Sequence, residues 1–528
     1  MNKKILFAFF VFTFLFGTAF YFWHQEKTAN STKETSQKES EKDKPVPFSM
    51  PDLKEPAFPN LICNIRDYGA IDNDEGLSTN SITKAIDDCH QKGGGKVVIP
   101  AGKWKSGAIH LKSNINFHLE EGAEIVFSTD FNDYLPVVFT RFQGMEMYGF
   151  SPLIYALNCQ NIALTGKGKL TGNGDFWWTW AQKDSVESRE ERQRLFEMAS
   201  SGVPTEKRIF GTEKSGLRPS FIQFVNSKNI LIEDLSIGDG PMWTIHPVYS
   251  ENIIIRKIKV DTYSANTDGI VIDSSRNVVI ENSSFSTGDD VIAIKSGLEE
   301  DGFRVNRPSE NIIVKNCYFQ KGHGAIAIGS EMSGGVRNVF VHDSIFSNTD
   351  NGIRIKSAKS RGGFIENVWV EDIKMENITN EIAIIDLSYN SKLKSSIDRE
   401  PEIRNINIKN IEASGYQRTL KVDGLLEGVM ENINFSNLKI LSKDGIYLSK
   451  AKNINFENIT LKMIDNNPLF EIKESQNITV SGFDCQDYRG LCFKIKGKKT
   501  DNISLKNISY EKKMLDIEER IKSRVFID

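Results

Sequence analysis

Asn252-Ile-Ile-Ile-Arg256 is followed 25 residues later by Asn277-Val-Val-Ile-Glu281, and the pattern of an asparagine ahead of apolar residues recurs along most of the chain. It starts at residues 229, 252, 277, 311, 338, 367, 405, 432, 453, 477 and 502. Most steps span 21 to 29 residues, and two longer steps span 34 and 38. A period near 25 with occasional longer steps is typical of a repeat architecture with insertions in some copies.

Each copy holds two or three short runs of alternating apolar residues, such as Asn311-Ile-Ile-Val and Asn316-Cys-Tyr-Phe, broken by turn-forming residues. So small a unit cannot bury its apolar face alone, so neighbouring units must stack on it. Parallel stacking brings equivalent residues of adjacent coils to about 4.8 Å from one another. The sequence therefore predicts an all-β fold, a parallel β-helix of about ten or more coils. Each asparagine is expected at a turn, where it tolerates left-handed dihedrals and bonds local backbone. A β-sandwich is the alternative, but its turns would not recur in this phase.

Both ends of such a solenoid expose strand edges and need covers. Residues 80–90 carry Ile82, Ala85, Ile86 and Cys89 on one helical stripe and end at three glycines, which predicts an N-terminal capping helix. Residues 514–526 are expected to form a second amphipathic segment at the other end.

The N-terminus predicts export. Two lysines precede an apolar run over residues 5–23, so residues 1–23 are expected to be a signal peptide or a signal anchor. Residues 24–60 are predicted to be a disordered polar linker, and residues 61–528 one folded domain. The protein is expected in the periplasm, outside the cell, or anchored in a membrane and facing outward, with residues 5–23 as the tether if they are retained. Export would permit a disulfide between Cys485 and Cys492, whereas Cys159 and Cys317 fit buried thiols at least as well.

Composition excludes several partners. A net charge of −4 and the lack of a basic block outside the N-terminal region give no sign of nucleic-acid binding. No group of cysteines and histidines has the spacing of a metal site, so neither a metal nor a cofactor is expected. The protein is expected to be a monomer.

Three acidic residues predict the chemistry. Asn266-Thr-Asp268-Gly269 precedes Gly288-Asp289-Asp290 by about one coil, which should align all three carboxyl groups on one face of the solenoid. Glycoside hydrolysis needs a protonated carboxyl group to donate to the leaving oxygen and an ionised one to activate water or attack carbon. Adjacent like charges keep at least one proton bound near neutral pH. Gly269 and Gly288 are expected to relax the backbone so that the acids reach the cleft.

Two later coils add polar groups in the same phase. His323 lies between two glycines that expose backbone to a ligand. Arg354 and Lys356 should share one strand face, with Ile355 pointing inward. Two aligned cations can bind an anionic sugar, although charge balance with the acids would also explain them.

The four motifs Asn-Thr-Asp-Gly, Gly-Asp-Asp, Gly-His-Gly and Arg-Ile-Lys, in this order, resemble the signature of glycoside hydrolase family 28, the polygalacturonases. The resemblance spans residues 61 to about 400. It implies a right-handed parallel β-helix that hydrolyses α-1,4-linked galacturonic acid in pectic polysaccharide or oligogalacturonides, with inversion at the anomeric carbon.

The resemblance also implies roles for the site residues. Asp289 matches the general acid, and Asp268 and Asp290 match the pair that activates water. His323 matches the histidine that tunes the acid. The remaining matches bind substrate: Arg354, Lys356 and, 33 residues further on, Tyr389. Lys295, Trp243 and His246 are expected to line the same cleft.

Insertions distinguish this chain from compact endo-acting relatives. They span residues 177–219 and 297–308, and together with residues 329–335 they resemble the bacterial exo-acting branch. Long loops over one end of a groove convert it to a pocket for a chain terminus, and Trp177, Trp178 and Trp180 offer stacking faces for sugars, unless they form a loop core. The alternatives are a hydrolase of rhamnogalacturonan or another decorated pectin, a calcium-dependent pectate lyase on a similar β-helix, and a non-catalytic β-helix that only binds polysaccharide.

Overall fold

The computed structural model describes residues 44–72, 76–182, 186–389, 398–425, 427–486 and 488–528. Its contacts divide the chain into two compact units, Met1–Pro47 and Phe48–Asp528. All architecture discussed below belongs to the second unit. Within the described residues no helix combines the length and apolar character needed to cross a bilayer; the predicted signal segment lies outside them.

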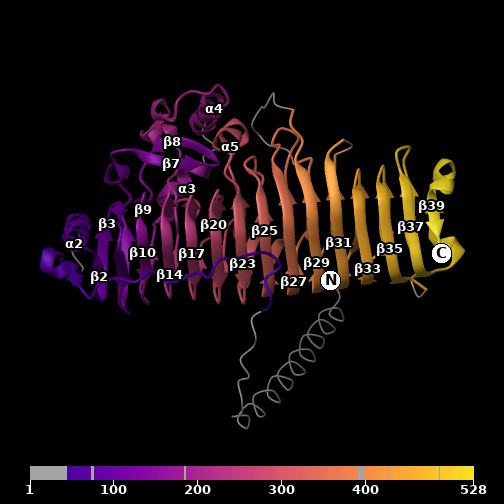
Figure 1. The fold of residues 1–528 in the computed structure, drawn as a ribbon, viewed down its shortest axis with the longest axis horizontal. Helices are drawn as coiled ribbons and strands as arrows, with labels where there is room; N and C mark the ends of the chain where they lie inside the picture. The colour runs from indigo at the N-terminus through magenta and orange to yellow at the C-terminus, as the bar shows by residue number, and fades with distance from the viewer. Residues whose placement is uncertain (1–43, 73–75, 183–185, 390–397, 426, 487) are drawn as a thin grey trace, which may run out of the picture. The chain divides into compact units, whose positions relative to one another are not determined.

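The second unit is a parallel β-helix, as predicted (Figure 1). One coil is formed by β16 (Ile245–Val248), β17 (Glu251–Arg256) and β18 (Lys259–Asp261), and the next by β19 (Ile270–Asp273), β20 (Arg276–Glu281) and β21 (Ser284–Ser286). Each strand pairs in parallel with its counterpart in the following coil, for example Ile254 opposite Val279. The repeat predicted from the asparagines is therefore one turn of the solenoid.

The coils build three stacks of parallel strands. The first stack forms the floor of the cleft described below and contains β4 (Ile109–His110), β9 (Ile154–Leu157), β13 (Ile222–Val225), β16, β19, β22 (Ile292–Lys295), the second half of β24 (Tyr318–Ile328), β26 (Thr349–Lys356), β28 (Glu381–Asp386), β30 (Arg418–Asp423), β32 (Asp444–Ser449), β34 (Phe470–Lys473), β36 (Phe493–Lys496) and β38 (Leu515–Ile517).

The second stack lies next along each coil and contains β1 (Ile62–Asn64), β2 (Gly95–Ile99), β5 (Ile115–Leu119), β10 (Gln160–Thr165), β14 (Lys228–Glu233), β17, β20, β23 (Ser309–Lys315), β25 (Val336–Ser347), β27 (Phe364–Ile378), β29 (Glu402–Gly415), β31 (Val429–Ser442), β33 (Lys452–Met463), β35 (Gln476–Asp484), β37 (Asp501–Ser509) and β39 (Val525–Ile527). The third stack contains β3 (Gly102–Ser106), β6 (Ala123–Phe127), β11 (Lys169–Thr171), β15 (Ser236–Gly238), β18, β21 and the first half of β24, and it continues in the second halves of β25, β27, β29, β31 and β33.

The interior is a column of stacked apolar side chains. Ile222, Ile245, Ile270, Ile292 and Ile326 follow one another in register on successive coils, and each is at most 1% exposed. Branched side chains suit this pleated, fully buried surface. The outward positions between them are thereby held in register too, which is what aligns functional groups along the cleft.

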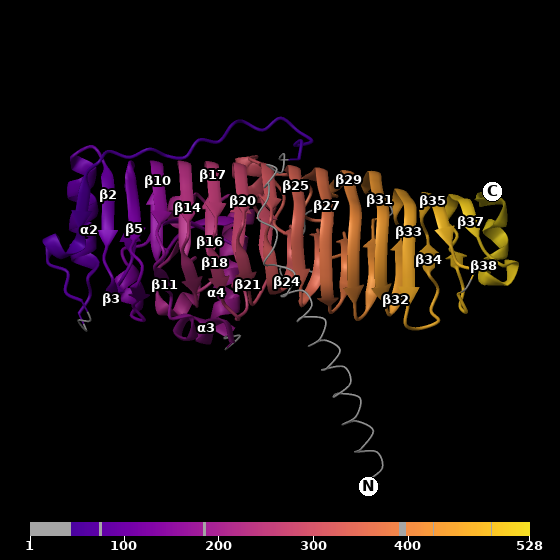
Figure 2. The same ribbon diagram turned by 90° about the horizontal axis from the view of Figure 1, so that it is seen from below.

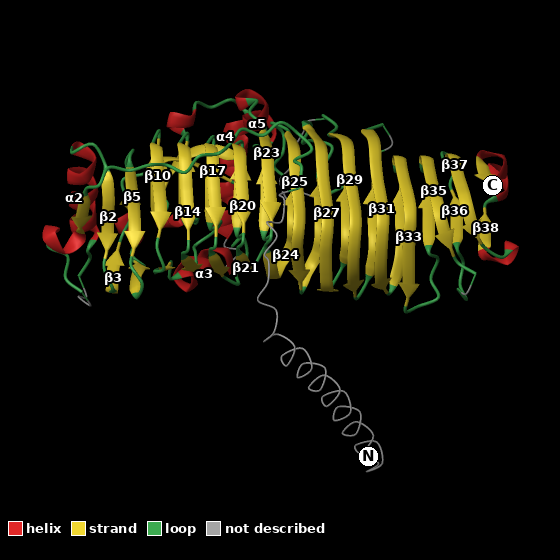
Figure 3. Cartoon of the chain, turned by 60° about the horizontal axis from the view of Figure 1, so that its bottom comes forward, coloured by secondary structure: helices red, strands yellow, loops and turns green. Residues whose placement is uncertain are grey.

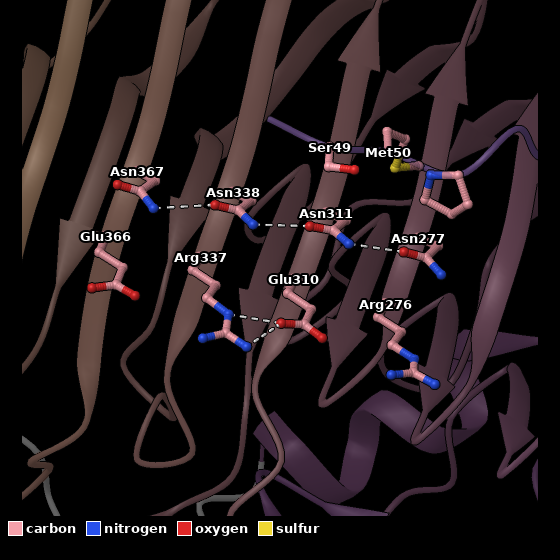
Figure 4. A pocket seen from close by; sticks show the side chains of 11 residues that line it. Ser49, Met50, Arg276, Asn277, Glu310, Asn311, Arg337, Asn338, Glu366 and Asn367 are labelled. Atoms are coloured by element: carbon pink, nitrogen blue, oxygen red, sulfur yellow. Dashed lines mark hydrogen bonds and ion pairs between the residues drawn. The ribbon is translucent and has the colours of Figure 1, made fainter. Parts of the chain in front are cut away.

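The repeat asparagines form a ladder on the outer surface (Figure 4). All eleven have positive φ between 50° and 58°, as predicted for turn residues. Their side chains bond mainly to one another rather than to local backbone: Asn311 donates to Asn277 at 3.0 Å and accepts from Asn338 at 2.9 Å. Beside them, Arg and Glu alternate on successive coils, in register, at Glu251, Arg276, Glu310, Arg337, Glu366, Arg404 and Glu431.

Covers close both ends of the solenoid. Helix α2 (Thr79–Gln91) buries Ile82, Ala85, Ile86 and Cys89, so the predicted capping helix is confirmed. At the C-terminal end the cover is two short 3-10 helices, Lys512–Met514 and Glu519–Arg524, with β38 and β39 between and after them. Cys485 and Cys492 form a disulfide, and Cys159 and Cys317 are buried free thiols.

Residues 48–60, the last part of the predicted disordered linker, are ordered. Residues 48–60 form a strap along the outer surface (Figure 2). The ring centroids of Phe48 and Trp369 lie 6.0 Å apart, and Glu55 forms an ion pair with Arg256 at 2.7 Å. Leu53 and Phe58 pack on apolar side chains of the second stack. The polar stretch that precedes residue 48 led the linker prediction to include these apolar residues.

The insertions lie over the N-terminal half of the solenoid (Figure 1). Their helices lie on the outside of the stacked strands (Figure 3). They comprise α3 (Gly174–Gln182), α4 (Val186–Ser200), α5 (Glu299–Val305) and a small sheet of β7 (Val138–Phe142), β8 (Met145–Gly149) and β12 (Ile209–Phe210). Buried ion pairs hold them together, including Arg208 with Asp301 at 2.6 Å.

The tryptophans of the insertion do not form a sugar platform. Trp177 and Trp178 are at most 1% exposed. Trp177 packs edge-on against Tyr134, Phe176 and Trp180. The predicted stacking role is therefore wrong for the two buried rings, and Trp177 is part of the main apolar core of the solenoid.

Candidate active site

A cleft of about 510 Å³ opens on the first stack of strands, beneath the insertions. Asp268 lies in the turn before β19, and Asp289 and Asp290 lie in the turn before β22. His323 is on β24, and Arg354 and Lys356 are on β26. All six of these predicted residues line the cleft, together with Tyr389.

The three carboxyl groups form one cluster. One oxygen from each lies within 4.8 Å of an oxygen from the other two. Asp268 and Asp290 are 3% and 1% exposed, and the Asp289 side chain is 19% exposed. Asp289 and Asp290 both face the cleft because they occupy a turn rather than a regular strand, where adjacent side chains would diverge.

Gly269 and Gly288 allow this cluster because neighbouring coils approach them closely. A side-chain carbon on Gly269 would lie 2.6 Å from the carbonyl oxygen of Val291, and one on Gly288 would lie 2.2 Å from that of Ser264. Neither glycine has a positive φ, so the prediction that they relax the backbone is wrong. They are required because neighbouring coils pack too closely for a side chain.

The acids differ in charge state. Burial, together with the nearby charge of Asp289, raises the pKa of Asp268 well above its ordinary value, and its Oδ1 has no hydrogen-bond partner among the described residues. Burial also acts to raise the pKa of Asp289, but the hydrogen bond from His323 and the charge of Lys356 outweigh it, so the pKa of Asp289 is lowered. Of these two acids, Asp268 is therefore the one that retains its proton to the higher pH.

Hydrogen bonds fix the orientation of Asp289. Its Oδ1 accepts the backbone N–H of Asp290 at 2.9 Å and lies 3.1 Å from His323 Nδ1, and its Oδ2 accepts the backbone N–H of Asn266 at 3.1 Å. The same contact with Asp289 raises the pKa of His323.

The cations lie beside Asp290. Lys356 Nζ donates to Asp290 Oδ2 at 2.7 Å, and Arg354 Nη1 approaches Oδ1 at 3.4 Å. The ring of Tyr389 lies 5.8 Å from the Arg354 guanidinium carbon and 5.7 Å from Lys356 Nζ. Acids, cations and an aromatic ring therefore face one space, which suits a ligand with a sugar ring and a carboxylate.

Of the three remaining predicted residues, two line the cleft. Lys295 is 4% exposed and pairs with Glu331 at 2.7 Å, above the ring of Trp243. Both Lys295 and Trp243 border the cleft floor. The Lys295 charge lowers the pKa of Glu331 to about 2 against the opposing effect of burial.

His246 is the exception among the predicted site residues. It is fully buried and contacts Ser220, Gln223 and Asp273 rather than the cleft. Its hydrogen bonds belong to the packing beneath the site. The structure thus corrects its prediction as a substrate contact.

Sequence reasoning missed Arg218 and Arg192. Both line the cleft, and both come from the insertion over residues 177–219. Arg218 donates to Asn266 Oδ1 at 2.9 Å, across 48 residues of sequence. No local pattern marks such a contact, because an insertion has no fixed phase with the repeat.

Known proteins share this arrangement. The profile of glycosyl hydrolases family 28 matches residues 207–457. The crystal structure of a hyperthermoactive exopolygalacturonase from Thermotoga maritima is 37% identical in sequence, with a TM-score of 0.72, over 78% of this chain and 94% of that one. This chain belongs to glycosyl hydrolase family 28. The resemblance predicted from the four motifs is thereby confirmed.

Curated family 28 proteins extend the comparison. A probable polygalacturonase from Vitis vinifera is 28% identical over 71% of this chain and 73% of its own length. An exo-poly-alpha-D-galacturonosidase from Dickeya chrysanthemi is 26% identical over 73% of this chain and 68% of its own length. The family establishes this chain as a glycoside hydrolase with a right-handed parallel β-helix.

Proposed function

We propose that this protein hydrolyses α-1,4-galacturonosidic bonds of polygalacturonan, with inversion and from a chain end. The observation that carries the proposal is the cluster of three carboxyl groups within 4.8 Å, in a cleft that also holds Arg354 and Lys356. Packing like charges together costs stability, which a site that only binds would not need. The names of the family relatives, which are polygalacturonases, support the substrate class.

In this mechanism Asp289 donates a proton to the leaving oxygen, while Asp268 and Asp290 take a proton from the water that attacks the anomeric carbon. Arg354 and Lys356 bind the carboxylate of a galacturonate unit beside the bond that breaks. His323 holds Asp289 in position through its contact at 3.1 Å.

One proton must move before the reaction. The pKa of Asp268 is raised and that of Asp289 is lowered, so Asp268 is the better proton holder, whereas Asp289 needs the proton to act as an acid. A bound galacturonate engages Lys356, one of the charges that lower the pKa of Asp289, and displaces water from that carboxyl group. Both effects favour transfer of the proton to Asp289, so Asp289 becomes a competent general acid only when substrate is bound.

Action from a chain end is supported by the insertions. Residues of α4, including Ser188 and Arg192, line the cleft together with Asp289, so the insertion adds a wall to the groove. The two relatives with exo-acting names point the same way. Covering one end of a groove excludes a continuous polymer and admits a terminus.

We further propose that the protein is exported, with residues 1–23 as a cleaved signal or a retained anchor. The charged start and apolar run support this, as does the disulfide between Cys485 and Cys492.

Product analysis tests the proposal. Polygalacturonic acid is incubated with the protein, with and without EDTA, and products are separated over time. Early galacturonate monomer or dimer, unaffected by EDTA, is expected. A ladder of sizes would contradict exo action, and a calcium-dependent unsaturated product would indicate a lyase. If the protein hydrolyses only rhamnogalacturonan or only xylogalacturonan, the proposed substrate, polygalacturonan, is wrong.

The stereochemistry is a strict test of the mechanism. Inverting enzymes generally hold their two carboxyl groups about 6.5–9.5 Å apart, and this cluster is tighter. Proton NMR of the first product should nevertheless show the β-anomer, because water rather than a carboxylate attacks carbon. An initial α-anomer would overturn inversion.

A further inference from the structure

The cleft holds more positive charge than its acids neutralise. Four of its cations face a carboxylate: Lys295, Arg354, Lys356 and Arg361. Three others also line the cleft: Arg189 and Arg192 on α4, and Arg218 just before β13. Of these three, Arg192 and Arg218 form no ion pair with any carboxylate in the described part of the chain. Both are supplied by the insertion over residues 177–219, not by the repeat.

Arg218 is a buried cation without a counter-ion. It is 6% exposed, and its Nη1 donates to the carbonyl oxygens of Pro241 at 2.7 Å and Ala265 at 3.0 Å. Neutral acceptors satisfy the N–H groups but leave the charge uncompensated, and burial lowers the pKa of Arg218 to about 10 despite the nearby acids. A desolvated cation gains strongly from an anionic ligand, because the protein has already met most of the desolvation cost.

Arg218 lies on the opposite side of the acids from Arg354. Its Nη2 bonds to Asn266, whose backbone N–H bonds to Asp289. Along the first stack, β13 lies three coils before β22, whereas β26 lies two coils after it. A sugar chain laid along the cleft therefore meets a cation on each side of the acids.

We propose that Arg218 and Arg192 form a second carboxylate-binding site, which holds the uronate of the terminal sugar across the reacting bond from Arg354 and Lys356. This inference rests on the proposed function and specifies its substrate. Because the insertion supplies both arginines and also covers this end of the cleft, the site selects a chain end that carries a free carboxylate.

The test compares Arg192→Gln and Arg218→Lys with a matched control, Lys214→Gln, which removes an exposed charge of the same insertion outside the cleft. The substrates are trigalacturonate and the same trimer with the non-reducing terminal carboxyl group reduced to an alcohol. For Arg192→Gln, KM for trigalacturonate should rise roughly tenfold to a hundredfold, the effect of losing a charge-assisted contact. The wild-type preference for the acid should shrink by a similar factor, while Lys214→Gln keeps both values.

The two proposals fail separately. If the wild type hydrolyses trigalacturonate and both arginine variants keep its KM and its preference, the second site is overturned and the proposed function stands. If the wild type shows no hydrolysis, the proposed function is wrong. Calorimetric titration with digalacturonate then decides the site: weaker binding to Arg192→Gln than to Lys214→Gln supports it, and equal binding overturns it. Should Arg218→Lys fail to fold, Arg192→Gln alone decides.

Discussion

The solenoid carries two polar grooves that treat charge in opposite ways. In the groove between the strap and the asparagine ladder, each charged side chain faces the opposite sign on the next coil, as Arg337 does with Glu310 at 2.7 Å (Figure 4). In the cleft, Asp268, Asp289 and Asp290 face one another instead. The outer groove takes one charged residue from each coil in register, whereas the cleft takes Asp268 from one coil and both Asp289 and Asp290 from the next.

The difference separates structural from functional use of the repeat. The two grooves are of similar size, about 740 Å³ for the outer groove and about 510 Å³ for the cleft, so size does not identify the active site. Its asparagines bond to one another and its arginines pair with glutamates, which leaves little to offer a ligand. The cleft keeps an unpartnered carboxyl oxygen and uncompensated cations, and pays for them in stability.

Removing the acid should produce the largest effect. Asp289→Asn is expected to lower kcat on oligogalacturonide by roughly 10²–10⁴-fold, because the amide cannot donate a proton to the leaving oxygen. Binding should persist, since the variant removes a negative charge near a polyanion. Reducing-end release and calorimetry measure the two properties.

Glu310→Gln in the outer groove is the matched control for this variant. It also removes one carboxylate from an in-register column, yet it should leave kcat unchanged. Equal losses of activity from the two variants would erase the distinction between the grooves.

The asparagine ladder should show a smaller effect, on stability alone. Asn311→Ala loses two side-chain hydrogen bonds and forces alanine to a φ of 58°. We expect about 3 kcal/mol of destabilisation, from about 1 kcal/mol per bond and 1–2 kcal/mol for the left-handed conformation. Asn311→Gly should cost less, because glycine adopts that conformation freely.

Urea unfolding of the two Asn311 variants measures this difference, and turnover should remain near wild type in both. An alanine variant as stable as the glycine variant would mean that the ladder does not depend on backbone conformation.

The same contrast explains what the sequence could predict. The asparagine period predicted the solenoid, and the spacing from Asp268 to Asp289 predicted their approach, because stacking converts one period into one step along the axis. Arg218 and His246 could not be placed in this way. Arg218 belongs to an insertion whose position does not follow from the repeat. His246 lies on a strand of the repeat, but whether its side chain faces solvent depends on the residues that cover that strand.

The packing of Trp177 and of residues 48–60 could not be predicted from the sequence either. A tryptophan-rich insertion reads equally well as a binding platform or as a small core, and only the packing around Trp177 decides for the core. A short proline-containing segment such as residues 48–60, next to a polar stretch, is taken for a linker until the surface that it contacts, including Arg256, is known.

Relieving the repulsion among the acids should have the smallest effect on stability, with a sign opposite to that of the asparagine-ladder variants. Asp268→Asn should abolish turnover but raise the free energy of unfolding at pH 7 by about 1–2 kcal/mol, the usual gain when an active-site cost is removed. Burial and Asp289 hold the pKa of Asp268 above its ordinary value of 3.8, so above that pH the unfolded chain releases a proton that the folded protein retains. The folded state of the wild type therefore loses stability as pH rises above 3.8, and asparagine, which does not titrate, avoids that loss.

The pH dependence distinguishes this cause from simple repacking. The advantage of Asp268→Asn should be greatest near neutrality and should vanish below pH 3.8, where Asp268 is protonated in both states. Calorimetric Tm values at pH 3.5, 5 and 7 measure it, with Glu310→Gln again as the control. A gain that persists unchanged at pH 3.5 would point to packing instead of charge, and no gain at pH 7 would mean that the cleft stores no electrostatic cost, which removes the physical contrast between the two grooves.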